Sequence, residues 1–252
     1  MPQTPAARPA KRGGVAAVDR ALAIVAALES DAQPLTLADI ASATGMYKST
    51  LLRLLVSLER SALVVRRSDQ RYTLGQFAFQ LGRAFEATYH LKECVLPVLE
   101  WLIQRGTESP SFHVWHDEKY RLCLFRIDSN HSTLDRVRAG DLLPLRRGAP
   151  GTVLRDFRSG LPMGHEVPLV RTSFGERDPS CGAVAVPVFG PGGELMGALS
   201  LSGPLERFSE AAVKKMGKTL LAAGERATRS LGGDWPGARE GRSAARTLRR
   251  AG

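Results

Sequence analysis

The amino-acid sequence predicts an α+β protein with two folded domains, a helical one that ends in a small hairpin and a mixed one. Two amphipathic helices joined by a glycine turn lie within residues 36–60, and a short basic hairpin follows them. From residue 110 onward, short apolar or alternating runs are separated by turn residues, a pattern typical of antiparallel strands. Helical segments flank these strands, so residues 92–232 are expected to form the mixed domain.

The composition and charge of the chain restrict its class and its partners. The formal net charge of the 252 residues is +10, and such a basic surface favours polyanions. Three cysteines lie far apart without a CxxC pair, so neither a disulfide framework nor a zinc site is expected. The chain has no long uncharged apolar run and no apolar signal-peptide core, which predicts a cytoplasmic protein with no membrane contact.

The first strong helix is expected over residues 15–30, where apolar residues recur at helical spacing: Val18, Leu22, Val25 and Leu28. It would pack across the helix pair of residues 36–60 and complete a three-helix core. The preceding residues 1–14 are rich in proline, alanine, glycine and basic residues, a composition that predicts a disordered leader.

The helix pair has recognisable boundaries. Thr36 is a candidate N-cap with Asp39 three residues on, and Gly45 is placed to end the first helix in a left-handed conformation. The second helix has a polar, basic face opposite an apolar stripe at Leu51, Leu54, Leu55 and Leu58. This pattern is typical of a helix-turn-helix, whose second helix presents its first residues to base edges in the DNA major groove. The residues expected to do so are Lys48, Ser49, Thr50 and Arg53.

The hairpin after this helix has the composition of a wing. Two short β-type runs, residues 63–65 and 72–74, enclose a polar turn that carries Arg66, Arg67 and Arg71. Guanidinium groups bind phosphate oxygens in a bidentate way, so these arginines are expected to contact the DNA backbone. Three helices followed by a basic hairpin predict a winged helix-turn-helix DNA-binding domain over residues 15–76.

Several segments of this domain together resemble the IclR family of bacterial transcriptional regulators. They are residues 18–22 (VDRAL), 37–41 (LADIA), 44–50 (TGMYKST), 53–55 (RLL) and 72–75 (YTLG). The resemblance runs through the N-terminal part of the chain, and its Lys-Ser-Thr-x-x-Arg-Leu-Leu segment is specific. It implies a linker helix over residues 77–91 and, over residues 92–232, a GAF-like effector-binding domain with a central antiparallel sheet.

The order of elements in the second domain follows from the sequence. A helix is expected over residues 92–105, with Pro97 in its first turn, and a meander over residues 111–116, 120–127 and 133–140. A second hairpin is expected over residues 182–190 and 194–203, before a last helix that begins at the cap Ser209. Residues 233–252 are rich in glycine and arginine, which predicts a disordered basic tail.

Two segments indicate where a small ligand could bind. The glycine-rich loop of residues 140–151 allows backbone N–H groups to approach a ligand, and amides at a helix N-terminus favour carboxylates. Ser200 and Ser202 place two hydroxyls on one face of a strand, which is either a ligand-binding or a solvent-facing surface. The resemblance implies a site for a small organic acid near Ala149, Pro150, Ala183 and the two serines, and the amides around Gly148 would join it.

The sequence departs from the family pattern around this site. Ala183 stands where the family often has cysteine, and residues 172–178 (TSFGERD) replace a more acidic stretch. The second change leads us to expect a pocket that repels a carboxylate less. Arg146 and Arg147, ahead of the glycine loop, are expected to be exposed.

No combination of residues predicts catalysis, a metal site or a cofactor. His113 and His116 have a metal-like spacing, but on a strand they point to opposite faces, so a structural or surface role is expected. Cys123 and Cys181 lack a neighbouring histidine or asparagine signal, and Glu176 with Asp178 is expected in a solvated loop.

The function predicted from the sequence is ligand-responsive control of transcription, as a repressor or an activator. The partners are a double-stranded, pseudo-palindromic operator and a small-molecule effector, with the protein acting as a homodimer or a pair of dimers. One alternative is a small-molecule-processing enzyme with an accessory helical domain, against which the missing nucleophile–base pair argues. Another is a structural or RNA-binding protein, against which the absence of aromatic stacking motifs argues.

Overall fold

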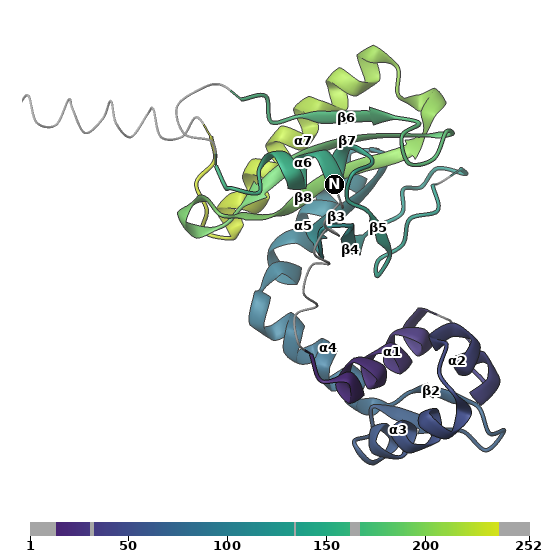
Figure 1. Cartoon of the computed structure of the whole chain (residues 1–252). Coiled ribbons are helices and arrows are strands. Elements are labelled where there is room, and N and C mark those ends of the chain that lie inside the picture. Colours follow the sequence, from purple (N-terminus) through teal and green to yellow (C-terminus); the bar gives the residue numbers. More distant parts are fainter. Residues whose placement is uncertain (1–13, 31–32, 134, 162–166, 237–252) are drawn as a thin grey trace, which may run out of the picture. The chain divides into compact units, whose positions relative to one another are not determined.

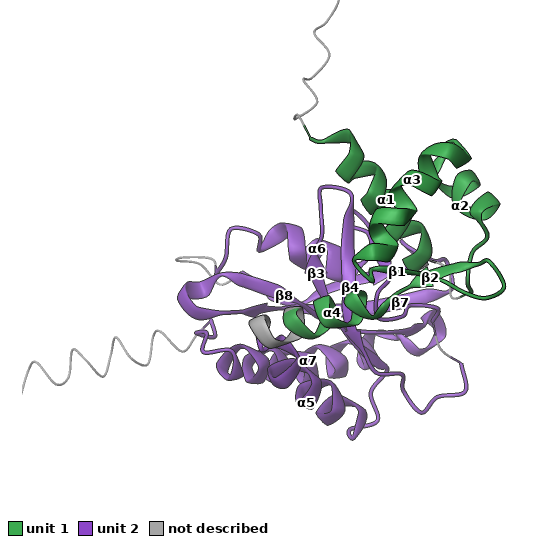
Figure 2. Cartoon of the chain, turned by 90° about the horizontal axis from the view of Figure 1, so that it is seen from below, with its two compact units in different colours: residues 1–88 green, residues 89–252 purple. Residues whose placement is uncertain are grey.

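A computed structural model describes residues 14–30, 33–133, 135–161 and 167–236, without the side chains of Ser30 and of residues 85–89. The chain divides into two compact units, residues 1–88 and 89–252, which are coloured separately in Figure 2. The expected leader and most of the expected tail lie outside the described residues. Among the residues that are described, no helix is long and apolar enough to cross a membrane.

The first unit is a winged helix (Figure 1). Its helices are α1 (Ala16–Ser30), α2 (Leu37–Thr44), α3 (Lys48–Arg60) and α4 (Gln76–Tyr89), and its strands are β1 (Val64–Arg66) and β2 (Tyr72–Leu74). The two strands pair antiparallel, with Arg66 opposite Tyr72. Ile24 of α1, Ile40 of α2 and Leu51 of α3 have no exposed surface and form the centre of the core. The expected three-helix core with a hairpin is therefore present.

Local contacts fix how α2 leads into α3. The Thr36 backbone N–H donates to the Asp39 carboxylate at 2.8 Å, and the Asp39 N–H donates to the Thr36 hydroxyl at 3.2 Å. This capping box satisfies N–H groups that the first helical turn leaves without partners. At the other end Gly45 adopts φ +67°, a left-handed conformation that ends α2 and turns the chain.

The second unit is built on one antiparallel sheet of six strands. In chain order its elements are α5 (Leu91–Ile103), β3 (Ser109–Trp115), β4 (Tyr120–Arg126), β5 (Leu142–Pro144), α6 (Ala149–Asp156), β6 (Arg171–Phe174), β7 (Cys181–Phe189), β8 (Leu195–Pro204) and α7 (Glu210–Ser230). Short 3-10 turns cover Pro191–Gly193 and Leu205–Arg207. The strand order across the sheet is β5-β4-β3-β8-β7-β6, and every neighbouring pair is antiparallel. The predicted α+β class with an antiparallel sheet is confirmed.

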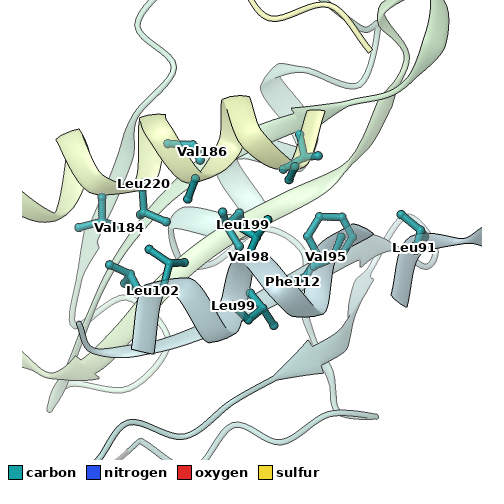
Figure 3. Packing of buried hydrophobic residues seen from close by; sticks show 14 of the residues in the cluster. Leu91, Val95, Val98, Leu99, Leu102, Phe112, Val184, Val186, Leu199 and Leu220 are labelled. Atoms are coloured by element: carbon teal, nitrogen blue, oxygen red, sulfur yellow. The ribbon is translucent and has the colours of Figure 1, made fainter. Parts of the chain in front are cut away.

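The two faces of the sheet pack against different helices. Phe112, Val186 and Leu199 point to one face, where they meet the buried residues of α5 and α7 (Figure 3). Ala185 and Ala198 point to the other face, which packs against α6. Because side chains alternate along a strand, Ser200 and Ser202 lie on the α6 side, together with Ala185 and Ala183 opposite them on β7.

Three parts of this unit differ from the sequence-based expectation. The described residues of segment 133–140 contain no strand, and β5 pairs with β4 instead; Asp135 of this segment is buried and pairs with Arg126 of β4. Pro97 lies in the interior of α5, not in its first turn. Trp235 is buried, and its ring lies so close to Gly224 that an added Cβ there would be 2.9 Å away. The packed chain thus continues at least to Trp235.

Candidate functional site

The first turn of α3 is an exposed surface without acidic residues. Lys48, Ser49 and Arg53 are exposed, and Thr50 is half-buried. They lie opposite Leu51 and the other leucines that anchor α3 in the core. The N-terminus of a helix has a positive dipole end and free N–H groups, so this turn suits a phosphate or another hydrogen-bond acceptor.

Sequence reasoning missed one residue on this surface. Tyr47 precedes α3 in an extended conformation, and 86% of its surface is exposed. Its side chain makes no capping hydrogen bond. The sequence did contain a signal for this residue: Tyr47 is a large aromatic residue outside the apolar stripe and directly before the predicted base-reading residues.

The wing arginines are exposed but differ in their local contacts. Arg66 lies over the ring of Tyr72, with its Cζ 5.7 Å from the ring centroid. Arg67 pairs with Asp69 at 3.7 Å. Arg71 donates to the backbone carbonyl of Pro34 at 3.2 Å, which ties the hairpin to the segment before α2. Arg71 is therefore partly structural, whereas Arg66 and Arg67 keep their guanidinium groups at the surface.

A small cavity of about 30 Å³ lies on the α6 side of the sheet. A volume of this size holds roughly one water molecule. Five of the six residues expected around an effector line it: Gly148, Pro150, Ala183, Ser200 and Ser202. The remaining one, Ala149, is buried beside them and contributes its N–H to the neighbouring hydrogen bonds. Among the other residues that line the cavity, which the sequence did not predict there, are His113, Arg121, Asp135, Ser173, Glu176, Arg177 and Asp178.

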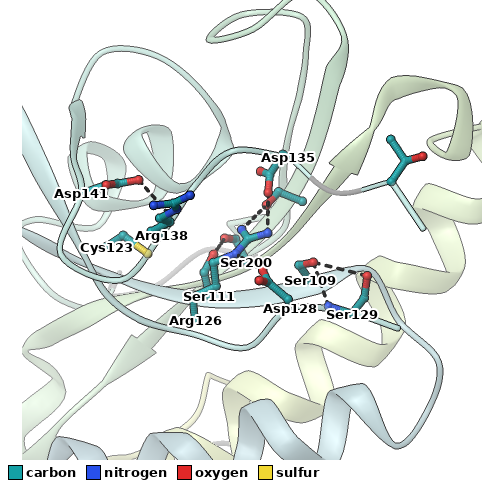
Figure 4. A network of polar contacts seen from close by, with 12 residues as sticks. Ser109, Ser111, Cys123, Arg126, Asp128, Ser129, Asp135, Arg138, Asp141 and Ser200 are labelled. Atoms are coloured by element: carbon teal, nitrogen blue, oxygen red, sulfur yellow. Dashed lines mark hydrogen bonds and ion pairs between the residues drawn. The ribbon is translucent and has the colours of Figure 1, made fainter. Parts of the chain in front are cut away.

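The serines of β8 belong to a buried chain of polar groups. The Ser200 hydroxyl lies 3.0 Å from that of Ser111, which lies 3.0 Å from Nε2 of His113 (Figure 4 shows Ser111 and Ser200). Arg126 Nη1 donates to the Ser202 hydroxyl at 3.4 Å. Ser200 is 1% exposed, so this strand face is not a solvent-facing surface.

The amides at the start of α6 are already bonded. Gly148 N–H donates to Oε2 of Glu176 at 2.9 Å, and Ala149 N–H donates to the Ser173 hydroxyl at 2.9 Å. Both acceptors come from β6 and the loop after it. Asp135, Glu176 and Asp178 line the cavity, so its wall contains acidic side chains. Glu176 accepts from a helix N–H group, and Asp135 pairs with the buried Arg126, because such groups need acceptors. The expectation that the pocket repels a carboxylate less stays a prediction.

Arg126 and Asp135 form a buried ion pair at the edge of the cavity. The Arg126 guanidinium lies 2.5 Å from the Asp135 carboxylate and 2.7 Å from that of Asp128 (Figure 4). Asp135 also lies 3.6 Å from Arg177. The Asp135 side chain is fully buried, and these two arginines offset the cost of burying its carboxylate.

Burial controls the protonation of the other titratable groups here. Burial, and then Arg121, Arg126 and Arg177, hold the pKa of His113 well below its ordinary 6.5, so its ring is neutral. Burial lowers the pKa of Arg121 to about 10 and raises that of the Cys123 thiol to about 12. Burial also raises the pKa of Cys181. Both thiols stay protonated and are poor nucleophiles. The described part of the chain contains no group of three potential metal ligands.

A winged helix followed by a sheet domain with a polar cavity defines a two-domain DNA-binding regulator. The family model described as the IclR helix-turn-helix domain matches residues 17–68. The chain is 27% identical to the HTH-type transcriptional regulator BhcR of Paracoccus denitrificans over 84% of this chain and 85% of that one. It is 22% identical to the transcriptional repressor IclR of Escherichia coli over 88% and 92%. These matches confirm the resemblance to the IclR family: residues 17–68 match its helix-turn-helix domain, and the chain is similar over most of its length to named transcriptional regulators.

A solved structure shows the same fold across both units. It is an IclR homologue from Microbacterium hydrocarbonoxydans in complex with 4-hydroxybenzoate, with a TM-score of 0.71 and 19% identity, covering 86% of this chain and 99% of that one. The curated relatives are named as transcriptional regulators and repressors, which favours a DNA-binding regulator over an enzyme.

Proposed function

We propose that this regulator binds its operator through α3 and the wing, and that a small organic acid bound in the second unit changes operator binding. The observation that carries the proposal is the exposed, acid-free first turn of α3 inside a winged helix. We place the protein in the cytoplasm, where the operator DNA is.

In the DNA complex, Lys48, Ser49, Thr50 and Arg53 face the major groove, with the DNA-binding domain spanning residues 15–76. Arg66, Arg67 and Arg71 contact the backbone, and residues 77–91 form the linker helix. The exposure of all seven side chains except the half-buried Thr50 supports this assignment. Selection from a random duplex library should return a pseudo-palindromic site. A selection that yields only non-specific, salt-sensitive binding would contradict sequence-specific regulation.

The effector site proposed is the cavity at Gly148, Ala149, Pro150, Ala183, Ser200 and Ser202, within an effector-binding domain that spans residues 92–232. Its buried hydroxyls supply donors and acceptors, and the Microbacterium homologue was solved in complex with 4-hydroxybenzoate. Because the cavity holds only about 30 Å³, its wall must move before an aromatic acid can enter.

The effector assignment is tested with the double variant Ser200→Ala, Ser202→Ala. Thermal-shift screening of small carboxylates first identifies a ligand, since a compound that binds the native state raises its melting temperature. Losing one hydrogen bond to a charged group costs about 1.5–3 kcal/mol, or roughly ten- to a hundred-fold in affinity. We expect calorimetry to show at least this loss, while operator binding is unchanged. Ser159→Ala, at an exposed position, is the matched control. Undiminished binding by the double variant would place the effector elsewhere.

The proposed active form is a homodimer or a pair of dimers. Val18 and Leu22 of α1 are exposed apolar residues on one helix face, and Phe79 and Leu81 of α4 are exposed as well. Exposed apolar side chains grouped in this way are typical of an interaction surface. A two-fold dimer would match the symmetry of a pseudo-palindromic operator.

A further inference from the structure

Arg121 is a buried cation that lacks an acidic partner. It comes from β4 and lines the cavity, and only 2% of its surface is exposed. No carboxylate lies within 4.0 Å of its guanidinium among the residues that the structure describes. Arg126 and Arg177, by contrast, share Asp135. A guanidinium with a pKa of about 10 is charged at neutral pH, and a buried charge without a counterion is costly.

The protein holds this guanidinium in one orientation. Arg121 Nη1 donates to the carbonyl oxygens of Pro144 and Arg147, the latter at 2.8 Å. Gly151 makes room for it, because an added Cβ there would lie 3.2 Å from Nη1, which is a tight contact. At Gly148 an added Cβ would lie 3.5 Å from Nη2, which is an ordinary van der Waals distance. The side chain is thus fixed before any ligand arrives, which lowers the entropy lost on binding.

The opposite edge of the guanidinium carries a donor without a partner. Nε has no hydrogen-bond partner among the described residues, although it is buried. Nε and Nη2 form the edge of an arginine that binds a carboxylate through two parallel N–H bonds. A buried N–H without a partner costs free energy, so an acceptor is expected at this edge.

His113, which also lines the cavity, has an unpartnered atom as well. Nδ1 of His113 is buried without a hydrogen-bond partner among the described residues, while Nε2 is engaged with Ser111. His113 and Arg121 lie on the same face of the sheet, since His113 pairs with Cys123, two residues along β4 from Arg121. The neutral ring of His113 can carry its proton on Nδ1 and donate it to a ligand oxygen.

The α6 amides, in contrast, are unavailable to a ligand in this structure. Glu176 and Ser173 already accept from Gly148 and Ala149. A ligand acid at those amides would have to displace the Glu176 carboxylate, whereas at Arg121 it would meet an unpaired charge.

We propose that Arg121 is the residue that selects an acidic effector: its Nε–Nη2 edge binds the ligand's carboxylate, and His113 Nδ1–H binds one of the same oxygens. This inference rests on the proposed effector site and names the side chain that gives it acid specificity. The α6 amides are a secondary contact that becomes available only when Glu176 moves.

The test compares each acid with its neutral amide on the full chain. The pairs are formate and formamide, benzoate and benzamide, and 4-hydroxybenzoate and 4-hydroxybenzamide, titrated at constant ionic strength by calorimetry and ligand-observed NMR. Losing a hydrogen bond to a charged group predicts a preference for the acid of roughly ten- to a hundred-fold in wild-type protein. Arg121→Gln should reduce this ratio to about one. Arg121→Lys should keep part of it, because lysine retains the charge without the planar pair of donors.

Glu176→Gln is the matched control, because it changes a charge in the same cavity without touching Arg121. It should keep the acid preference or increase it. Circular dichroism and operator binding establish that each variant is folded. If Arg121→Gln fails to fold, the wild-type ratio and Arg121→Lys decide the question.

Three results overturn the inference. The first is equal binding of acid and amide by wild-type protein, which leaves the effector site in place but removes its acid specificity. The second is a folded Arg121→Gln variant that keeps the preference. The third is no binding of any acid or amide by a protein that still binds its operator, which removes the effector part of the proposed function as well.

Discussion

Single glycines decide how closely the chain packs around Arg121. Gly148 adopts φ +83°, a conformation that side chains other than glycine rarely take. At Gly151 an added Cβ would overlap the carbonyl oxygen of Leu145. Within the glycine-rich loop, Gly151 therefore allows the close approach of a guanidinium and of the residue that follows β5.

The first prediction at the residue scale concerns Arg53. Its side chain is exposed on α3, so Arg53→Ala should leave the fold unchanged. If Arg53 contacts a base edge, the variant should lose about 1–3 kcal/mol of operator binding and relax the preference at one base position. Fluorescence anisotropy with the selected operator and its single-base variants measures both. Arg60→Ala, at the last residue of α3, is the control. Unchanged affinity in Arg53→Ala would count against base contact.

The second prediction concerns the buried His113. Its pKa in the folded state lies well below 6.5, so the unfolded chain binds the additional proton. The stability that His113 contributes is therefore present above pH 6.5 and is lost as the pH falls below it. We expect a fall of up to about 1.4 kcal/mol per pH unit in the free energy of unfolding, and a smaller fall in His113→Gln.

Urea unfolding followed by tryptophan fluorescence measures this effect. All three tryptophans (Trp101, Trp115 and Trp235) belong to the second unit, so the signal reports that unit. His116→Gln, with an exposed ring on the same segment, should behave like wild type. Equal pH dependence in wild type and His113→Gln would show that the histidine is not responsible.

For single residues, the sequence predicted which side chains are exposed better than it predicted which polar side chains pair with each other. Lys48 and Arg53 are exposed because an amphipathic helix must turn one face outward, and periodicity reveals that face. The burial of Arg121 and Asp135 has no such signal. It depends on carbonyl groups and ion pairs contributed by residues distant in the sequence, such as Arg147 and Arg126.

At the scale of helices and strands, some local sequence signals are sufficient to predict where an element begins and ends. The capping box of Thr36 and Asp39 and the left-handed Gly45 set the ends of α2 as expected, because these contacts span only a few residues. Pro97 could not be placed in this way. An interior proline costs about 3 kcal/mol in an isolated helix. In α5 the ring of Pro97 is exposed, and burial of Val95, Val98 and Leu99 holds the helix together around it.

The third prediction belongs to the wing. Arg66 and Arg67 keep exposed guanidinium groups, so their loss should weaken binding to operator and random DNA alike. Each lost phosphate contact should reduce the slope of log affinity against log salt by about one unit. Arg71→Ala should in addition lower the thermal stability of the first unit, since Arg71 bonds to Pro34. A changed base preference with an unchanged slope in the double variant Arg66→Ala, Arg67→Ala would mean that the wing reads bases.

At the scale of the whole molecule, the two proposed functions lie on separate units. Operator contacts are proposed on residues 1–88 and effector contacts on residues 89–252, each with its own buried core. The existence of both domains was predictable because the hydrophobic period changes from helix to strand along the chain. For the cavity, the sequence predicted only the two segments that contribute to it, the glycine-rich loop of residues 140–151 and the strand with Ser200 and Ser202. The segments around Asp135 and Glu176 contribute acidic residues to its wall, and hydrophobic periodicity does not predict where these segments lie.

The fourth prediction concerns the association of two copies of the chain. A pseudo-palindromic operator has two half-sites, so two DNA-binding units are needed to occupy it. Leu22 is 58% exposed on α1, one turn from the exposed Val18. If this face forms a two-fold interface, each substitution occurs twice in it, and its effect on the free energy of dimerisation is doubled. Since burying a leucine contributes about 1.5–3 kcal/mol, Leu22→Glu should weaken dimerisation at least roughly a hundred-fold. Its exposure in the monomer means that the fold should tolerate the change.

Sedimentation equilibrium and operator binding measure the two consequences of Leu22→Glu. The variant should sediment as a monomer at concentrations where wild type is a dimer. It should also lose affinity for the full operator while binding a single half-site as wild type does, because the contacts of α3 are intact. Ala23→Glu adds the same charge at the next exposed position of α1 and is the matched control. If Leu22→Glu stays dimeric, the two copies meet through another surface, and the exposed residues Phe79 and Leu81 of α4 become the next candidates.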